Sequence, residues 1–388
     1  ESVNATGPSL TVALVPDLAA SLIPGTLGLD GVSVSGMTQL PQTDNLLSAF
    51  NGREVSVARG SQTVKAKVLD ASRNLFQLKD GSVFTASASD VTFPDLNGVR
   101  LNPAWQFSLA SGGPAVVSYL TRALAWQPRY DLSLTASSTV WHAWADVSNQ
   151  SSVPFSAPRL ELVAGQVNLA TPRMYENFGA AAAPMAKSAD VSVQPAGESA
   201  GLRLYQYAKP VTLGPRTVTS VPFAQPHVSA QRLVEYRGSF STAAKQTLNL
   251  ARVYDVTADD DLPAGTVTIR DEGRVVGQDT LPDTTKDETQ TLTAGTDFDL
   301  RLTRTVSVLE NTRAQARYRV SFSLVNTKTR PVTLRLVEGL SQYGRTFELS
   351  APVLPNLKRD ADGFTAVATL APSARLEASY EVTYKPVP

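Results

Sequence analysis

The segment Ser118–Gly165 constrains the fold more than any other, because short runs of alternating apolar and polar residues follow one another between turn-forming residues. Such runs are typical of antiparallel strands with one buried face. The expected strands are Tyr130–Leu134, Val140–Val147 and Arg159–Val163. Three of the four tryptophans of the chain lie in this segment. Large aromatic rings bury more area than other side chains, so the segment marks a hydrophobic core.

The expected strand at 140–148 has two different faces, because successive side chains of a strand point to opposite sides. One face is apolar and consists of Trp141, Ala143, Ala145 and Val147. The other face is mixed and consists of His142, Trp144, Asp146 and Ser148. This pattern predicts the wall of a β-sandwich, with the apolar face turned inward.

A recognisable pattern runs through the same segment. Trp126, Pro128 and Tyr130 alternate with other residues, an alternating strand ends at Asn149, and a Leu-Glu-Leu-Val strand leads to the glycine of Leu160–Gly165. This pattern resembles the bacterial domain of unknown function 4139 family, over most of the chain. Members often carry a long coiled coil near the N-terminus, and no heptad run is present here. The resemblance implies exported, envelope-associated β-domains and no agreed activity.

Alternating runs recur along the rest of the chain, so we predict an all-β fold. The expected architecture is a pair of tandem immunoglobulin-like β-sandwiches with a small SH3-like β-barrel inserted near the N-terminus. The predicted division gives residues 1–45 to strands that join the first sandwich and residues 46–95 to the inserted barrel. Residues 96–230 form the first sandwich, with a flexible, small-residue loop at 178–201, and residues 231–388 form the second.

An internal repeat links the two predicted sandwiches. Asn149 stands five residues before Pro154, as Asn326 stands five residues before Pro331. In both places a strand with a Leu-x-Leu-Val sequence follows the proline, and a glycine follows that strand. The repeat predicts the same hairpin in both sandwiches. Chance similarity is the alternative, because hairpins use a limited set of residue patterns.

Composition excludes several classes of function. Among 388 residues, 35 basic and 35 acidic side chains cancel, and they form no basic stripe for nucleic acid. No apolar run reaches the roughly 18 residues that a membrane-spanning helix needs. Cysteine is absent, which excludes disulfides, thiolate metal sites and cysteine nucleophiles. We expect an extracytoplasmic protein, in the periplasm or at the cell surface, whose signal peptide was removed before Glu1; an artificially shortened chain would look the same.

Catalytic motifs are scarce in this sequence. It has two histidines and lacks the Gly-x-Ser-x-Gly elbow, the phosphate-binding loop and the dinucleotide fingerprint. The acidic runs Asp259–Asp261 and Asp283–Glu288 lack the glycine and glutamate spacing of a calcium loop, which favours solvated turn charges.

Copper chemistry is the enzymatic alternative, because copper accepts imidazole and thioether ligands. The candidate ligands are His142, His227, Met174, Met185 and Asp146. If they converged, such a site could support superoxide dismutation. Copper-only superoxide dismutases are also β-sandwich proteins, but they use more histidines than this chain has. The opposing interpretation is that each histidine is a solvated or hydrogen-bonding residue.

Aromatic side chains offer a binding alternative. Trp144 on the mixed face and Tyr205 and Tyr207 on another strand are candidates for an interaction patch, or else half-buried sheet residues. We therefore expect a secreted bacterial envelope protein that acts as an interaction or structural module in an outer-membrane or S-layer type assembly. Its partner would be an envelope protein or another copy of the chain. The alternatives are a copper-binding, superoxide-dismutase-like enzyme and a binder of cell-wall polysaccharide.

Overall fold

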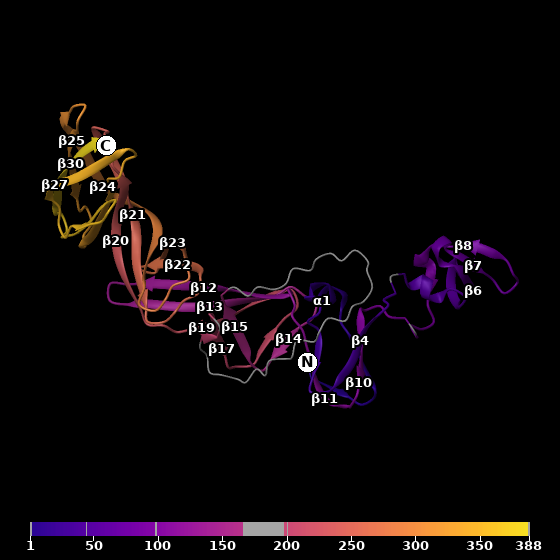
Figure 1. Ribbon diagram of the computed structural model, residues 1–388. Helices are drawn as coiled ribbons and strands as arrows, with labels where there is room; N and C mark the ends of the chain where they lie inside the picture. Colours follow the sequence, from indigo (N-terminus) through magenta and orange to yellow (C-terminus); the bar gives the residue numbers. More distant parts are fainter. Residues whose placement is uncertain (1, 44, 98, 166–197, 200, 387–388) are drawn as a thin grey trace.

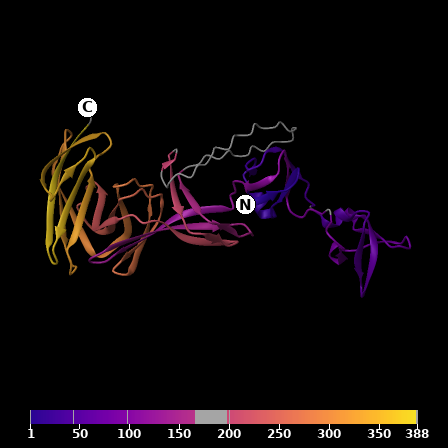
Figure 2. The ribbon, with the colours of Figure 1, turned by 90° about the horizontal axis from the view of Figure 1, so that it is seen from below.

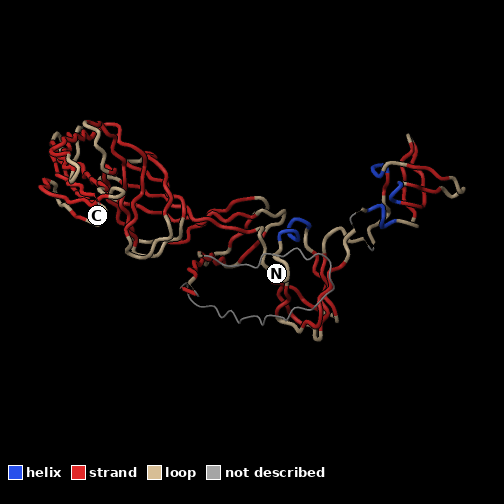
Figure 3. Tube along the Cα trace, turned by 45° about the horizontal axis from the view of Figure 1, so that its top comes forward, coloured by secondary structure: helices blue, strands red, loops and turns tan. Residues whose placement is uncertain are grey.

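The structure is a computed structural model of the 388-residue chain, and it describes residues 2–43, 45–97, 99–165, 198–199 and 201–386. Strands make up nearly all of the regular structure, which confirms the predicted all-β fold with stacked sheets. Figures 1 and 2 show an elongated molecule, with the C-terminal strands at one end and the module of residues 46–93 at the other. Figure 3 shows helix only near the N-terminus and in that module.

The N-terminal region is a small sandwich of two three-stranded sheets, β1-β11-β3 and β2-β10-β4. Its elements are β1 (Ser2–Ala5), β2 (Ser9–Ala13), α1 (Pro16–Ser21), β3 (Gly28–Asp30), β4 (Val34–Leu40), β10 (Ala104–Leu109) and β11 (Gly113–Ser118). A core around Phe107, Leu29 and Val117 lies between the two sheets. No helix in the described parts of the chain has the length and apolar character needed to cross a bilayer.

Residues 46–93 interrupt this sandwich between β4 and β10 and form a module of their own. Its elements are the 3-10 helices η1 (Leu46–Phe50), η2 (Ala71–Arg73) and η3 (Ala88–Asp90) and the strands β5 (Glu54–Arg59), β6 (Gln62–Asp70), β7 (Leu75–Gln77), β8 (Val83–Thr85) and β9 (Val91–Thr92). The antiparallel sheet has the order β8-β7-β6-β5-β9. Phe50, Val57 and Phe76 are fully buried in its core. These residues therefore have a core of their own, and their likeness to SH3 barrels stays a prediction.

The middle sandwich is built from a five-stranded sheet and a shorter layer opposite. Its strands are β12 (Leu124–Leu134), β13 (Thr139–Asn149), β14 (Phe155–Ala157), β15 (Leu160–Ala164), β16 (Glu198–Ser199), β17 (Leu202–Tyr207), β18 (Val211–Leu213), β19 (Thr217–Ala224), β22 (Gly265–Asp271) and β23 (Arg274–Leu281). The large sheet has the order β19-β13-β12-β22-β23, and β14–β18 and β15–β17 pair in the other layer. Trp141, Ala143, Ala145 and Val147 are all buried, so the predicted apolar face of β13 is confirmed.

The C-terminal region is one nine-stranded sheet that wraps around a single core, in the order β27-β30-β25-β24-β21-β20-β26-β29-β28. Its strands are β20 (Val228–Ser239), β21 (Lys245–Ala258), β24 (Thr289–Asn311), β25 (Ala316–Val325), β26 (Val332–Gly339), β27 (Arg345–Val353), β28 (Lys358–Arg359), β29 (Gly363–Leu370) and β30 (Arg375–Pro386). The likeness of these sandwiches to immunoglobulin domains stays a prediction.

The domain boundaries differ from the predicted division in two places. Residues 1–45 pair with β10 and β11 and share no sheet with β12 or β13, so they belong to a separate sandwich. The strands β22 and β23 lie within 231–388 but join the middle sheet, where β22 runs parallel to β12. Both differences have one cause. Pairing between distant strands depends on which apolar faces meet, and the alternation within one strand does not specify its partner. The loop predicted at 178–201 lies almost wholly outside the described residues.

Three long strands pass from the middle core into the C-terminal core. In β21, Tyr254 and Val256 are buried in the middle core while Leu250 is buried in the C-terminal core. In β24, Leu292 and Leu300 divide in the same way, and β20 contributes to both cores. The two sandwiches therefore share three strands (Figure 1), although the pairing of β21 with β24 shifts its register between Asn249 and Val253, where one core gives way to the other.

The internal repeat is visible in the hydrogen bonds of the two asparagines. The Nδ2 of Asn149 donates to the carbonyl oxygens of Val153, Leu213 and Gly214, at 2.7, 3.2 and 2.9 Å. The Nδ2 of Asn326 donates to those of Arg330, Leu370 and Ala371, at 2.9, 3.0 and 3.1 Å. Each Oδ1 accepts from the backbone N–H two residues later, at 3.0 Å. The turns that follow β13 and β25 therefore share one construction, as the repeat predicted. They are not the predicted hairpins, because β13 does not pair with β14 or β15 and β25 does not pair with β26.

Replacing Asn326 by alanine is expected to lower the free energy of unfolding by about 2 kcal/mol, because buried carbonyl oxygens lose their donor. Asn326 is fully buried, so water does not replace the amide. The matched variant Asn149→Ala should cost a similar amount, since Asn149 is 2% exposed and makes the same bonds. Urea unfolding measures both variants. A cost near zero for either would show that its amide does not stabilise the turn.

Candidate functional site

Two of the predicted copper ligands lie on the outward face of β13. His142 is exposed, and Asp146 follows four residues later on the same face. At about 3.3 Å per residue the two Cα atoms are roughly 13 Å apart, too far for one ion. Asp146 has other partners: Arg129 Nε lies 3.0 Å from it, and the Ser220 hydroxyl donates to it at 2.5 Å.

The second histidine lies on the connection between β19 and β20. His227 is 96% exposed, and its Nδ1 is 3.2 Å from an Asp259 carboxylate oxygen. Met174 and Met185 lie outside the described residues. Within the described part of the chain, no group of three or more histidine, aspartate and glutamate side chains is placed to hold a metal ion.

The predicted aromatic residues do not form one patch. Tyr205 packs edge-on against Phe223, with ring centroids 4.9 Å apart, and its hydroxyl donates to the Asp261 carbonyl at 3.0 Å. Burial raises the pKa of Tyr205 to about 12. Tyr207 packs against the same middle core. Trp144 lies on the opposite, outward face of β13, with the Arg129 guanidinium 6.0 Å from its ring centre.

The two acidic runs meet each other and stabilise turns. Leu262 and Thr284 bridge the two segments through paired backbone hydrogen bonds. The Asp261 carboxylate accepts from the Lys286 N–H at 2.6 Å and pairs with Arg203. The Asp283 carboxylate accepts from the Ala264 N–H at 2.7 Å. These contacts agree with the interpretation of the runs as turn charges.

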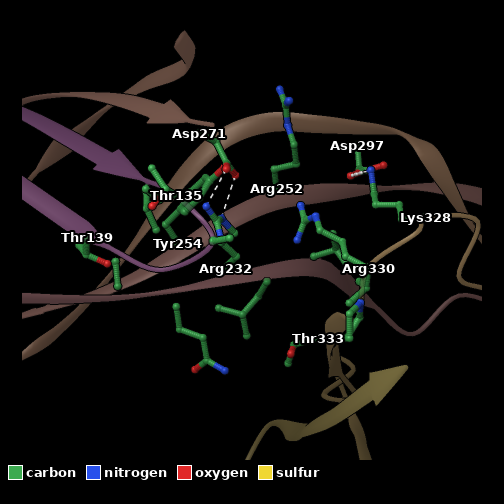
Figure 4. Close-up of a pocket in the computed structure, with 18 of the residues that line it drawn as sticks. Thr135, Thr139, Arg232, Arg252, Tyr254, Asp271, Asp297, Lys328, Arg330 and Thr333 are labelled. Atoms are coloured by element: carbon green, nitrogen blue, oxygen red, sulfur yellow. Dashed lines mark hydrogen bonds and ion pairs between the residues drawn. The ribbon is translucent and has the colours of Figure 1, made fainter. Parts of the chain in front are cut away.

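A polar cavity of about 450 Å³ lies at the junction of the middle and C-terminal sandwiches. The β12–β13 hairpin, the strands β20 and β21 and the loop between β25 and β26 line this junction cavity. Figure 4 places Thr135 and Thr139 on one side and Lys328 and Arg330 on the other, with Arg232 between them. The strands β20, β21 and β24, which belong to both sandwiches, contribute to its walls.

Two of the four basic side chains in the junction cavity are neutralised by carboxylates. Arg232 lies 2.9 Å from Asp271, whose carboxylate also accepts from the Tyr254 hydroxyl at 2.9 Å. Lys328 lies 2.9 Å from Asp297, a carboxylate that is 5% exposed. These pairs fix the two ends of the cavity in place.

The other two basic side chains have no carboxylate partner among the described residues. Arg252 donates through Nη2 to the carbonyl oxygens of Val276 and Ala294, at 3.2 and 2.8 Å, and its buried Nε has no hydrogen-bond partner. Arg330 is exposed in the loop that follows β25. Glu272 and Asp299 are second carboxylate partners of Arg232 and Lys328, so the charges around the cavity balance. What suits an anionic ligand is the Arg330 guanidinium, which has no carboxylate partner among the described residues (Figure 4).

The chemistry of the junction cavity favours binding over catalysis. No histidine lines it, and the carboxylates of Asp271 and Asp297 are held by cations. A general base needs a free lone pair within hydrogen-bond reach of the reacting group, and none is offered here.

Sequence reasoning did not find this cavity. The available signal was the repeat, because Lys328 and Arg330 lie in the loop anchored by Asn326. Arg232, Arg252 and the 134–139 hairpin come from distant parts of the chain, and only the fold brings them together. Comparison with known proteins adds no identification, because no family model, no curated protein and no solved structure matches this chain.

Proposed function

We propose that the protein is an interaction or structural module of a bacterial cell-envelope assembly, located outside the cytoplasm. The observation that carries the proposal is the continuity of β20, β21 and β24 through two cores, which joins the two sandwiches in a body suited to holding partners at fixed spacing. Two smaller domains extend this body in a row (Figure 1). The resemblance to the domain of unknown function 4139 family, drawn from Trp126, Pro128, Tyr130 and Asn149, supports an envelope location.

The partner in this proposal is an envelope protein or a second copy of the chain. Open strand edges at β23, β27 and β28 offer backbone groups for pairing with another chain. Apolar side chains also lie exposed, among them Phe298 at 85% and Tyr343 at 105%. Such groups are common anchors in protein interfaces.

The native size of the protein tests this function. Extracted gently from its source cells, the chain is expected to elute in an assembly much larger than its own 41.4 kDa. The purified chain, run alone at the same concentration, is the control that separates self-association from binding of other proteins. Elution of the extracted chain at the monomer mass would contradict the proposal.

Elemental analysis of the same preparation separates the proposal from the copper-enzyme alternative. An interaction module is expected to carry no stoichiometric metal. The opposite result would be roughly one copper per chain together with superoxide dismutation. Loss of both in His142→Ala or His227→Ala, with unchanged thermal stability, would replace the proposal with the enzymatic alternative.

A further inference from the structure

The junction cavity carries an inference about ligand chemistry. We propose that it binds an acidic saccharide, with a sugar carboxylate held by Arg330 and with sugar hydroxyls against the threonine side. The inference deepens the proposed function and rests on it for the presence of envelope glycans.

The Arg330 guanidinium favours an anionic ligand. Arg330 has no ion pair in the part of the chain that the structure describes, and Arg252 is bonded only to backbone carbonyls. A guanidinium presents a planar fork of donors that matches a carboxylate in two parallel hydrogen bonds. A bound carboxylate would therefore gain a charge-assisted contact without displacing the pairs that hold Arg232 and Lys328.

The hydroxyl groups of the cavity favour a saccharide over other anions. Thr135, Ser138, Thr139 and Thr333 line it. The Thr333 hydroxyl is 3.3 Å from that of Thr369, and a hydroxyl with one such partner keeps a further lone pair as an acceptor. Thr135 and Ser138 lie 2.8 Å apart and fix the shape of the hairpin. The lining has one aromatic ring, that of Tyr254, which is buried and bonded to Asp271, so no free platform for a nucleobase is present.

The size of the cavity also argues against a lone inorganic anion. Its volume of about 450 Å³ falls in the range of small-molecule sites, roughly 300–1,000 Å³. A water molecule takes about 30 Å³ of liquid volume, so an ion of a few atoms would leave most of the space to solvent. A ligand of several atoms with many hydroxyls fills it better.

The first copy of the asparagine-anchored turn provides a comparison within the chain. Its loop is anchored by Asn149 as the second is by Asn326, and Val153 stands where Arg330 stands. The backbone carbonyl oxygen of each accepts a hydrogen bond from the Nδ2 of the asparagine. The side chain at this position is therefore free to vary while the loop keeps its shape. Valine in place of Arg330 is a substitution that the same loop already tolerates.

Isothermal titration calorimetry with the full chain tests the inference. The probes are trigalacturonic acid, the uncharged maltotriose and inorganic phosphate. We expect trigalacturonic acid to bind, more weakly as salt is added, and maltotriose not to bind. Arg330→Val should weaken binding about tenfold and Arg330→Glu should abolish it, because each removes the guanidinium fork. Arg313→Glu, at an exposed arginine outside the cavity, is the control and should bind nearly as the parent chain does.

Three outcomes would overturn the inference. They are no binding of trigalacturonic acid, equal binding of maltotriose, and unchanged binding in both Arg330 variants with melting temperatures equal to that of the parent chain. Phosphate that competes fully at similar concentration would show a small-anion site instead. None of these results bears on the native size of the extracted chain, so a failure here and a failure of the proposed function are distinguishable.

Discussion

Replacing Arg304 by alanine is expected to lower the free energy of unfolding by about 3–5 kcal/mol, because the substitution leaves a buried carboxylate without its partner. Arg304 and Glu338 are both fully buried in the C-terminal core, with Arg304 Nη2 2.7 Å from Glu338 Oε1. Arg304 also donates through Nη1 to the Ser241 carbonyl at 3.0 Å. Removing the guanidinium would strand the charge of Glu338 among tyrosine rings.

The pair itself is expected to contribute little net stability. Arg304 Nε and Glu338 Oε2 are buried without hydrogen-bond partners, so the desolvation cost of the two charges is only partly offset. The double variant Arg304→Met, Glu338→Leu should therefore unfold within about 1 kcal/mol of the parent chain, or be more stable.

Urea unfolding measures these variants against a matched surface pair. Arg375 and Glu377 form an ion pair with side chains 64% and 59% exposed. Arg375→Ala should cost less than about 1 kcal/mol, since water screens an exposed pair. If Arg304→Ala and Arg375→Ala lowered the free energy of unfolding equally, Arg304 and Glu338 would not be a buried pair of charged groups.

Alkaline pH is expected to unfold the chain over a narrow range above about pH 10, the ordinary pKa of tyrosine. Burial raises the pKa of Tyr205 and Tyr236 to about 12. Burial also raises the pKa of four further tyrosines, namely Tyr130, Tyr254, Tyr380 and Tyr384. Each of these six groups keeps its proton in the folded chain at a pH where the unfolded chain has lost it.

The sign of the effect follows from the protons bound in each state. Below about pH 10 both states bind the tyrosine protons, and the stability is fully present. Between about pH 10 and 12 the unfolded chain binds fewer protons, so the free energy of unfolding falls as pH rises. Each tyrosine contributes up to about 1.4 kcal/mol per pH unit, and the six together at most about 8 kcal/mol per pH unit.

Thermal unfolding followed by circular dichroism, together with the near-ultraviolet absorbance of tyrosinate, measures this effect. Most tyrosinate should form in the same transition as unfolding. Tyr343→Phe is the control, because Tyr343 is fully exposed and should not change the transition. Tyr380→Phe should make the loss of stability less steep. Tyrosinate that forms gradually near pH 10 in a still-folded chain would contradict the prediction.

Local patterns in the sequence predicted individual strands and turns well. The alternation at 140–148 gave the buried face of β13, with Ala145 fully buried. The repeated spacing from asparagine to proline likewise gave the two turns that Asn149 and Asn326 anchor. These features depend on residues close in sequence, so short-range sterics and periodicity are enough to predict them.

The candidate site was less accessible to sequence reasoning. His142 and His227 drew attention because histidine is scarce, yet rarity says nothing about where a side chain lies. Arg330 was not a candidate, because an exposed arginine in a loop is ordinary. It matters only because the parallel pairing of β20 with β26 brings this loop against the β12–β13 hairpin and β21.

The sequence by itself determined that the chain is all-β, that one face of β13 is buried, and that one asparagine-anchored turn occurs twice. Tertiary structure alone decided that β22 pairs with β12, that β20, β21 and β24 run through two cores, and that a polar cavity lies at their junction. The physical reason is the range of the interactions. Alternation and turn chemistry are set by neighbouring residues, whereas strand pairing and cavity lining depend on which apolar faces of distant segments bury one another.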